Sequence, residues 1–218
     1  MVTKQTLNDL GSDSIHIWRI DLDGPIGNLK DLLSMEEMER AQTKIVAKEQ
    51  DRFVVARGSM RSILADYLDV SGGEIEFVQG EQGKPSVDYT SSKIEFNLTH
   101  CANMALLAVA KATPVGIDLE RIRTRPMQLK IARRMFSEKI FRELEQLPSA
   151  QQDAVFFQHW TELEASAKCI GDGIFSYKQG DKSITTKHFT PQAGWIACVA
   201  ANGKDISSME LKHFRYRI

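Results

Sequence analysis

Two long helical stretches, each followed by short apolar strands, constrain the fold of this chain more than any other feature of its sequence. The first stretch spans about residues 34–68 and the second about residues 149–170, where glycines follow. Each begins with a serine followed three residues later by Glu or Gln, which is the capping-box pattern: Ser34 with Glu37, and Ser149 with Gln152. Long helices that alternate with groups of strands predict an α+β fold.

The strand-like segments are short and are separated by Gly, Pro, Asn and Ser. Ser14–Asp21 alternates apolar and polar residues and predicts a half-buried strand with His16 pointing outward. Further strands are expected at 74–79, 94–98, 104–111 and 115–120, with Ser71-Gly72-Gly73 ending the helix before them. Helices are expected again after Pro126, and strands finish the chain.

A short internal similarity suggests two related halves. Residues 102–110 (ANMALLAVA) align with residues 192–200 (QAGWIACVA), and each segment lies downstream of a long helix. A match of this length between buried strands can also arise by chance. Thr113-Pro114 is the natural joint, so we expect an N-terminal half at 1–113 and a C-terminal half at 114–218.

Composition indicates an ordinary globular protein. The 218 residues are 42% hydrophobic and 26% charged, with a net charge of -1, so no overall field attracts nucleic acid or a membrane surface. Any anion site must therefore be local. Cys101, Cys169 and Cys198 are far apart and form no CxxC pair, which predicts buried thiols in a reducing cytoplasm. No apolar run is long enough to cross a membrane.

Two constellations carry possible chemistry. In Val115–Glu120 the alternation places Asp118 and Glu120 on one strand face, where they could hold Mg²⁺ together with substrate phosphates. The alternative is an exposed acidic face, since the pair Asp21 and Asp23 has the same spacing. Trp160, Glu164 and Lys168 recur every four residues along one helix face, where the last two could form a metal ligand and a phosphate-binding cation or simply a surface ion pair.

Other motifs exclude more than they indicate. The loop from Gly80 to Pro85 is too short for a Walker A motif and has proline at the Ser/Thr position, so an ATPase is disfavoured. Asn97-Leu-Thr99-His100 ends a strand with a hydroxyl and an imidazole that could meet an anion, although a lone histidine there is commonly structural. The sequence contains no GxSxG and no HExxH motif.

In combination, four motifs resemble those of the 4'-phosphopantetheinyl transferases of the surfactin-synthetase activator type. They are Gly83-Lys84-Pro85, Phe96-Asn-Leu-Thr-His100, Gly116-Ile-Asp118-Leu-Glu120 and Trp160-Thr-x-x-Glu164-Ala-x-x-Lys168. Their order is more informative than any one of them. The resemblance implies a pseudo-twofold pair of similar α+β halves, with coenzyme A in the cleft between them.

The same resemblance implies a role for each matched residue. The magnesium ligands would be Asp118, Glu120 and Glu164, and the catalytic residues would be Glu164 and Lys168, with Lys168 meeting the pyrophosphate of coenzyme A. The N-terminal half would bind the nucleotide: His100 and Arg52, with Arg40, at the 3'-phosphate, Lys84-Pro85 along the adenine, and Thr99 nearby.

By resemblance the chain is a cytoplasmic, monomeric enzyme of the holo-[acyl-carrier-protein] synthase type, active in secondary metabolite biosynthesis. It would transfer phosphopantetheine from coenzyme A to a serine of an apo acyl, aryl or peptidyl carrier protein and release 3',5'-ADP. Two alternatives stay open: a weakly active or non-enzymatic relative that binds coenzyme A or a carrier, and a metal-dependent phosphodiesterase.

The sequence departs from the family pattern at several positions. Leu163 stands where the family usually has a lysine, at a position expected near the pyrophosphate, so Leu163→Lys should be tolerated unless the position packs in the core. A glutamate that serves as base in some members falls near Ile140, leaving Glu138, Glu143 or Glu164 as candidates. Cys101 stands where a second serine often follows the histidine.

Overall fold

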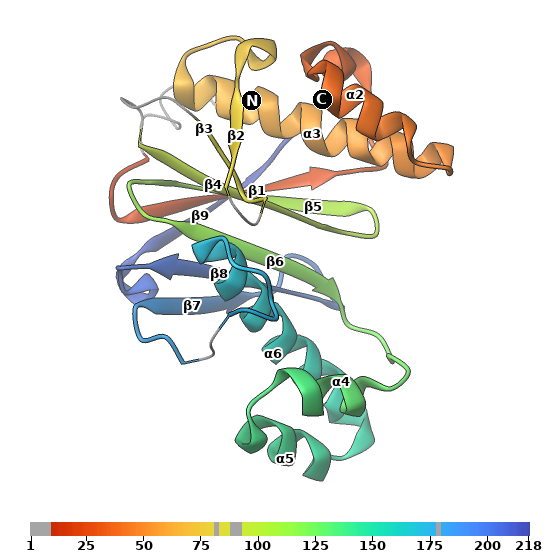
Figure 1. The fold of residues 1–218 in the computed structure, drawn as a ribbon, viewed down its shortest axis with the longest axis vertical. Coiled ribbons are helices and arrows are strands. Elements are labelled where there is room, and N and C mark those ends of the chain that lie inside the picture. The colour runs from red at the N-terminus through yellow and green to blue at the C-terminus, as the bar shows by residue number, and fades with distance from the viewer. Residues whose placement is uncertain (1–9, 81–82, 88–92, 178–179) are drawn as a thin grey trace.

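The computed structural model describes residues 10–80, 83–87, 93–177 and 180–218, and in it two β-sheets lie between two long helices (Figure 1). The α-helices are α2 (Met35–Gln42), α3 (Ala47–Leu68), α4 (Gln128–Met135), α5 (Glu138–Gln146) and α6 (Ser149–Ile170). Short 3-10 turns are η1 (Gly27–Leu32), η2 (Gly72–Glu74) and η3 (Ile206–Ser208). Within these described ranges, no helix is both long enough and apolar enough to span a lipid bilayer.

The described part of the chain contains nine strands. They are β1 (Ser14–Asp21), β2 (Phe77–Gln79), β3 (Pro85–Val87), β4 (Ile94–Cys101), β5 (Met104–Lys111), β6 (Val115–Arg121), β7 (Ile184–Phe189), β8 (Trp195–Asn202) and β9 (Glu210–Arg215). The first sheet has the order β4-β5-β1-β9, the second has the order β6-β8-β7, and β2 and β3 form a separate hairpin. Only the β1–β9 pair is parallel among these ladders.

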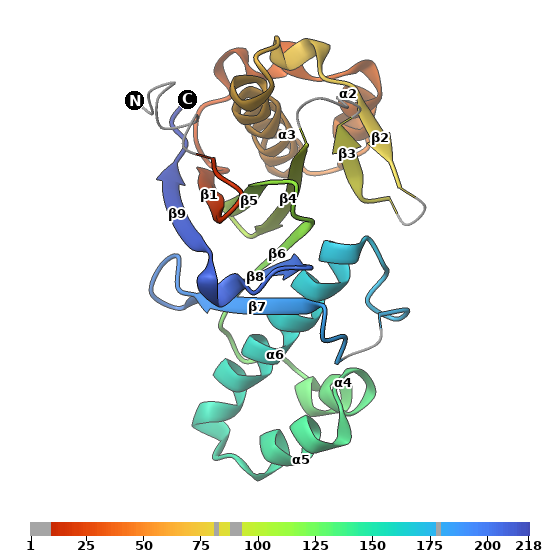
Figure 2. The ribbon, with the colours of Figure 1, turned by 90° about the vertical axis from the view of Figure 1, so that its left-hand side faces the viewer.

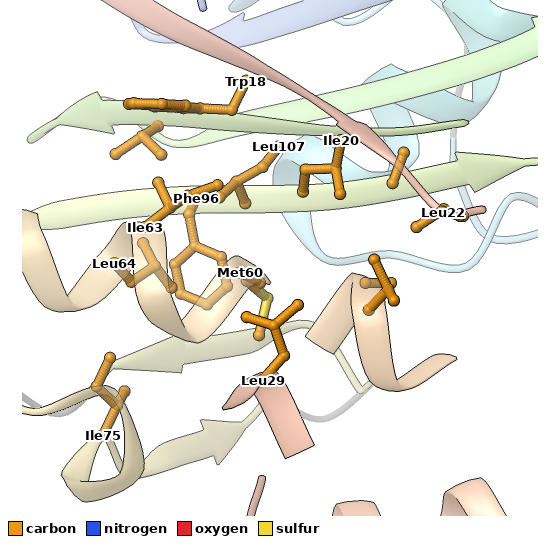
Figure 3. Close-up of a cluster of buried hydrophobic side chains, with 14 of the residues drawn as sticks. Trp18, Ile20, Leu22, Leu29, Met60, Ile63, Leu64, Ile75, Phe96 and Leu107 are labelled. Carbon is orange, nitrogen blue, oxygen red and sulfur yellow. The ribbon is translucent and has the colours of Figure 1, made fainter. Parts of the chain in front are cut away.

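Both faces of the first sheet are buried. Trp18, Ile20 and Leu107 point toward α3, where they pack with Met60, Phe96 and their neighbours (Figure 3). Side chains of the opposite parity, such as Ile17, Leu106 and Ala108, meet the inward face of the second sheet. The continuous apolar sequence of β5 follows from this arrangement, because successive strand residues face alternate sides.

The second sheet is covered in turn by α6. Ala165 and Cys169 of the helix pack on Cys198 and Ala200 of β8, and these small residues allow a close approach. At the far end of α6, aromatic and aliphatic side chains form a separate core with α4 and α5, which extend below the sheets (Figure 1). The side view shows the same succession of layers, from α3 through both sheets to α6 (Figure 2).

The two sheets repeat one order of elements. Toward the N-terminus, β1, the 22-residue helix α3, β4 and β5 occur in this order, with α2, β2 and β3 inserted between them, and β5 lies between β4 and β1 in the sheet. Toward the C-terminus the same order is β6, the 22-residue helix α6, β7 and β8, with α4 and α5 inserted before α6, and β8 lies between β7 and β6. The predicted α+β fold is confirmed.

Most predicted strands are confirmed, and the structure corrects one helix. The strand at Ser14–Asp21 has the predicted bounds. The stretch predicted as one helix at 34–68 is two helices, because the chain leaves helical geometry after Gln42 and resumes at Ala47. The Thr43 hydroxyl donates a hydrogen bond to the Arg40 carbonyl, and β-branched residues come soon after it in the sequence. Both features disfavour continuation of the helix.

Two local predictions were wrong. His16 is fully buried rather than outward, because β1 is a central strand with α3 on its polar face, and its Nδ1 lies 2.7 Å from the Tyr67 hydroxyl oxygen. The capping box at Ser149 is absent: the Gln152 amide donates to the Leu147 carbonyl instead, and Pro148 precedes the first helical turn. The capping box of Ser34 and Glu37 is present, with both hydrogen bonds.

Candidate functional site

A polar cavity of about 470 Å³ opens between β4, β6 and α6. We call it the acidic cavity, and its charged side chains are Asp118 and Glu120 of β6, Glu164 and Lys168 of α6, and Arg123 and Arg125 after β6. Thr99, His100, Cys101 and Trp160 complete its polar and aromatic lining. The two constellations predicted separately from the sequence therefore line one cavity.

Local sequence explains how β6 and α6 bring these residues together. Val115, Ile117 and Leu119 face the core between the sheets, so the alternate residues Asp118 and Glu120 face the other way. Gly116 permits contact of the strand with the helix backbone, because an added Cβ would lie 2.0 Å from the Ala165 carbonyl oxygen. No other residue type fits at this crossing.

Lys168 stands between two carboxylates of the acidic cavity. Its Nζ donates to Asp118 Oδ1 at 2.6 Å and lies 3.7 Å from Glu164 Oε2. Desolvation raises the pKa of Glu164 above its ordinary value; the Lys168 ammonium opposes this effect, while the charges of Asp118 and Glu120 add to it. Glu164 is therefore a carboxylate that gains from an additional cation.

Among the described residues, one oxygen of Asp118 has no hydrogen-bond partner. Asp118 is 6% exposed, and Oδ1 also accepts a hydrogen bond from the Thr99 hydroxyl at 3.1 Å, but Oδ2 is buried without a hydrogen bond. Glu120 Oε2 lies 3.2 Å from Arg123 Nη1 and accepts from the Cys101 thiol at 3.5 Å. Across the described ranges, no three His, Cys, Asp or Glu side chains are already gathered as a metal cluster.

The donor set nevertheless suits Mg²⁺. Magnesium takes hard oxygen ligands and commonly uses one or two carboxylates together with phosphate oxygens and water. A buried carboxylate oxygen without a hydrogen bond is costly unless a cation or a donor reaches it. Asp118 Oδ2, with Glu120 and Glu164 on the same cavity wall, offers such a position.

A second cavity of about 260 Å³ lies beside α3 and has a basic lining. We call it the basic cavity: its cationic residues are Arg40, Lys44, Arg52 and Arg57, and Phe53, Pro85, Asn97 and His100 are among the others. Arg52 Nε donates to Asp23 Oδ1 at 2.8 Å, and Nη1 lies 3.1 Å from Glu49 Oε1. The hydrogen bond with Asp23 is the main cause that raises the pKa of Arg52.

His100 belongs to both cavities. Desolvation lowers the pKa of its imidazole, and the nearby Lys168 ammonium lowers it further. At neutral pH the imidazole is therefore mainly neutral, and a bound phosphate would favour its protonated form. His100 marks the point where the basic cavity adjoins the cavity that holds the three carboxylates.

Lys84 does not line either cavity with its side chain. Its Nζ donates to the carbonyl oxygens of Val115 and Cys169, at 3.0 and 2.7 Å. Pro85, the next residue, does line the basic cavity. Of the two residues predicted to lie along the adenine, Lys84 thus makes a structural contact and Pro85 lines the cavity. Glu81 and Gln82 of the same loop lie outside the described residues.

Leu163 faces away from the acidic cavity. It is 4% exposed and packs in the core formed with α4 and α5, among Phe136, Phe141 and their neighbours. Of the three glutamates considered as base, Glu138 and Glu143 lie on α5 and pair with Arg142 and Lys139, whereas Glu164 lines the acidic cavity. The three cysteines carry free thiols, and Cys169 and Cys198 are buried as predicted, while Cys101 is partly exposed.

Sequence reasoning missed four cations, of which Arg57 lines the basic cavity from α3. Lys44, four residues after Arg40 and just beyond the end of α2, lines the basic cavity, and this proximity in the chain was visible in the sequence. Arg123 and Arg125 line the acidic cavity, and Arg125 lies with its guanidinium carbon 5.3 Å from the Trp160 ring centroid. The alternate arginines directly after the acidic strand were the available signal.

Comparison with known proteins identifies the family of these motifs. The profile of the 4'-phosphopantetheinyl transferase superfamily matches residues 114–208. The chain is similar to 4'-phosphopantetheinyl transferase HetI of Nostoc sp., with 38% identity over 179 residues that cover 80% of this chain and 76% of that protein. It is also similar to psf-1 of Bacillus pumilus, 34% identical over 68% of this chain and 62% of that protein. Sfp of Bacillus subtilis is 25% identical over 72% of this chain and 71% of that protein.

Proposed function

We propose that this chain, which belongs to the 4'-phosphopantetheinyl transferase superfamily and to its Sfp type, moves the phosphopantetheine arm of coenzyme A to a serine of an apo acyl, aryl or peptidyl carrier protein. The reaction releases 3',5'-ADP and uses Mg²⁺. The observation that carries the proposal is the junction at His100 of a basic cavity with a cavity of three carboxylates. Coenzyme A carries two anionic groups that would match them, a 3'-phosphate for the basic cavity and a pyrophosphate that would meet the carboxylates together with Mg²⁺.

The basic cavity would bind the nucleotide end. Arg40, Arg52 and His100 would meet the 3'-phosphate, with Lys44 as an additional cation, and Pro85 would lie along the adenine. Arg52 is already oriented by Asp23, so a phosphate can bind without ordering a free side chain. Thr99, which donates to Asp118, would lie on the pyrophosphate side of the nucleotide.

The acidic cavity would hold the metal and the reacting phosphates. Asp118, Glu120 and Glu164 would be the magnesium ligands, and the bound ion would neutralise charge on the pyrophosphate oxygens. The unpartnered Oδ2 of Asp118 supports this assignment. Lys168 would bind the same phosphates as a point charge, because its ammonium lies between the carboxylates of Asp118 and Glu164.

The chemical step is a phosphoryl transfer. The carrier serine oxygen forms a bond to the phosphorus next to the pantetheine, and the bond from that phosphorus to the bridging oxygen breaks, so that 3',5'-ADP leaves. Glu164 would take the serine proton, since it is the one of the three candidate glutamates that lies on the cavity wall. Lys168 would stabilise the charge that develops on the leaving group.

We also propose that the two halves, 1–113 and 114–218, are a pseudo-twofold pair with the cleft between them. The repeated order of strand, 22-residue helix and two strands supports this relation. One chain supplies both cavities, which supports action as a monomer. Three free thiols suit the reducing cytoplasm as its compartment.

Product analysis tests the activity against its alternatives. Incubation with coenzyme A and Mg²⁺, with and without a panel of apo carrier proteins, should release 3',5'-ADP only when a carrier is present. Release without any carrier would identify a phosphodiesterase. Coenzyme A binding with no release, for every carrier in the panel, would identify a non-enzymatic relative.

A further inference from the structure

The side chain of Lys84 reaches from the β2–β3 hairpin to both elements of the acidic cavity. Its ammonium donates to the carbonyl oxygen of Val115 at 3.0 Å and to that of Cys169 at 2.7 Å. Val115 is the first residue of β6, and Cys169 directly follows Lys168 near the end of α6. One side chain therefore bonds the strand that carries Asp118 to the helix that carries Glu164.

The hydrogen bond to Cys169 supplies a donor to a carbonyl group at the C-terminal end of α6. The last four carbonyl groups of an α-helix have no intrahelical partner, and the Cys169 carbonyl is one of them. A cation at this end also interacts favourably with the helix dipole. Gly171 has a φ of 77°, and a Cβ added there would lie 3.6 Å from both Cβ and Cδ of Lys84, so the lysine stem crosses directly over the helix terminus.

The contact lies beside the closest approach of β6 to α6. At Gly116, next to Val115, an added Cβ would lie 2.4 Å from the Cys169 amide nitrogen. The strand and the helix thus meet at the residues that Lys84 joins. Asp118 and Lys168, which form the 2.6 Å pair in the acidic cavity, lie three residues after Val115 and one residue before Cys169.

The backbone of Lys84 is joined directly to a residue that lines the basic cavity. Pro85 follows it, pairs with Gln79 in the hairpin, and lines the basic cavity. The Lys84 carbonyl accepts a hydrogen bond from the Gly80 amide at 2.9 Å. A displacement of Lys84 would therefore move the wall of the basic cavity relative to β6 and α6.

We infer that Lys84 is a positioning residue that sets the spacing between the basic cavity and the acidic cavity, so that the 3'-phosphate and the pyrophosphate of one coenzyme A molecule are held at once. The inference rests on the proposed function. Lys84 touches neither the nucleotide nor the reacting phosphates in this role. Its effect passes through Pro85 on one side and through the joined ends of β6 and α6 on the other.

Calorimetric titration with two ligands tests this role without a catalytic readout. Coenzyme A occupies both cavities, whereas adenosine 3'-monophosphate reaches only the basic cavity. Lys84→Met keeps the stem and removes the donors, and it should raise the Kd for coenzyme A about tenfold or more while the Kd for adenosine 3'-monophosphate stays within about threefold. An equal loss for both ligands, or no loss for either, would overturn the inference.

Three further variants complete the test. Lys84→Arg retains donors to both carbonyls and should restore most of the coenzyme A affinity. Lys204→Met is the matched control, because the Lys204 ammonium also donates to a backbone carbonyl, that of Ser12, away from both cavities, and neither ligand should bind differently. If Lys84→Met does not fold, Lys84→Gln, with an amide donor, must show the same preferential loss of coenzyme A affinity.

Measurements on the wild-type protein distinguish a failure of the proposed function from a failure of the role of Lys84. If it binds no coenzyme A, the proposed function fails and the role of Lys84 fails with it. If it binds coenzyme A and modifies a carrier while Lys84→Met binds both ligands as the wild type does, the role of Lys84 alone is refuted.

Discussion

Leu163→Lys introduces an ammonium at the position where the sequence pattern suggested a missing cation. Leu163 is 4% exposed and packs against the aromatic core of α4, α5 and α6. Losing its apolar contacts costs about 2 kcal/mol. The buried charge adds about 1 to 3 kcal/mol, provided that the longer side chain can reach toward Glu162, which lines the same cavity of about 220 Å³.

A total of about 3 to 5 kcal/mol should lower the melting temperature by roughly 10 °C or more in a chain of this length. Differential scanning calorimetry measures the change. Leu163→Met conserves volume and should cost less than about 1.5 kcal/mol. Ala154→Lys places the same charge on an exposed position of α6 and should leave the melting temperature nearly unchanged.

The opposite outcome would refute the assignment of Leu163 to the core. If Leu163→Lys melts within about 2 °C of the wild type and its kcat is level or higher, the side chain faces the phosphates and the reading of this helix face is wrong. A large fall in melting temperature with no fall for Ala154→Lys supports a packing role.

Three other predictions follow from contacts of the N-terminal half. The pKa of Glu37 is lowered because Arg57, Ser34 and Arg61 outweigh desolvation, so its ion pairs stabilise the fold above the ordinary glutamate pKa of 4.5 and this contribution is lost as pH falls through the folded value. Urea unfolding of Glu37→Gln should therefore show a loss of about 3 kcal/mol at pH 7 and a smaller one at low pH; an equal loss at both would contradict this account. Arg52→Ala and His100→Ala should raise KM for coenzyme A more than for dephospho-coenzyme A, and equal increases would remove them from the 3'-phosphate site. Tyr67→Phe leaves the Trp18 indole N–H without its 2.9 Å acceptor and should cost about 1 to 3 kcal/mol by urea unfolding, whereas unchanged stability would show that another acceptor takes its place.

The sequence predicted those elements whose residues follow one simple period. Strand alternation gave β1 and β6 and placed Asp118 and Glu120 on one face, a short apolar run gave β5, and four-residue spacing placed Glu164 and Lys168 together. Local patterns cannot reveal what packs on each face. His16 reads as outward because it is polar, yet α3 covers that face of the central strand.

Long-range contacts also decided the roles of single side chains. Lys84 matches a nucleotide-binding motif, but its ammonium donates hydrogen bonds to carbonyl groups that lie 31 and 85 residues further along the chain. Leu163 stands next to Glu164 in sequence, but one residue along a helix turns the side chain by about 100°, away from the cavity and into the core. Tertiary packing, rather than the local sequence, determines both outcomes.

Intact-mass measurement of an apo carrier protein after incubation with coenzyme A and Mg²⁺ tests phosphopantetheine transfer by this chain most directly. With the wild-type protein, the carrier should gain the mass of one phosphopantetheine group, and a chelator of divalent cations should prevent the gain. Asp118→Ala should fold and leave the carrier unmodified, whereas Asp13→Ala, which removes an exposed carboxylate outside both cavities, should modify it at the wild-type rate. An unmodified carrier with the wild-type protein across acyl, aryl and peptidyl carriers, or full modification by Asp118→Ala, would contradict the account.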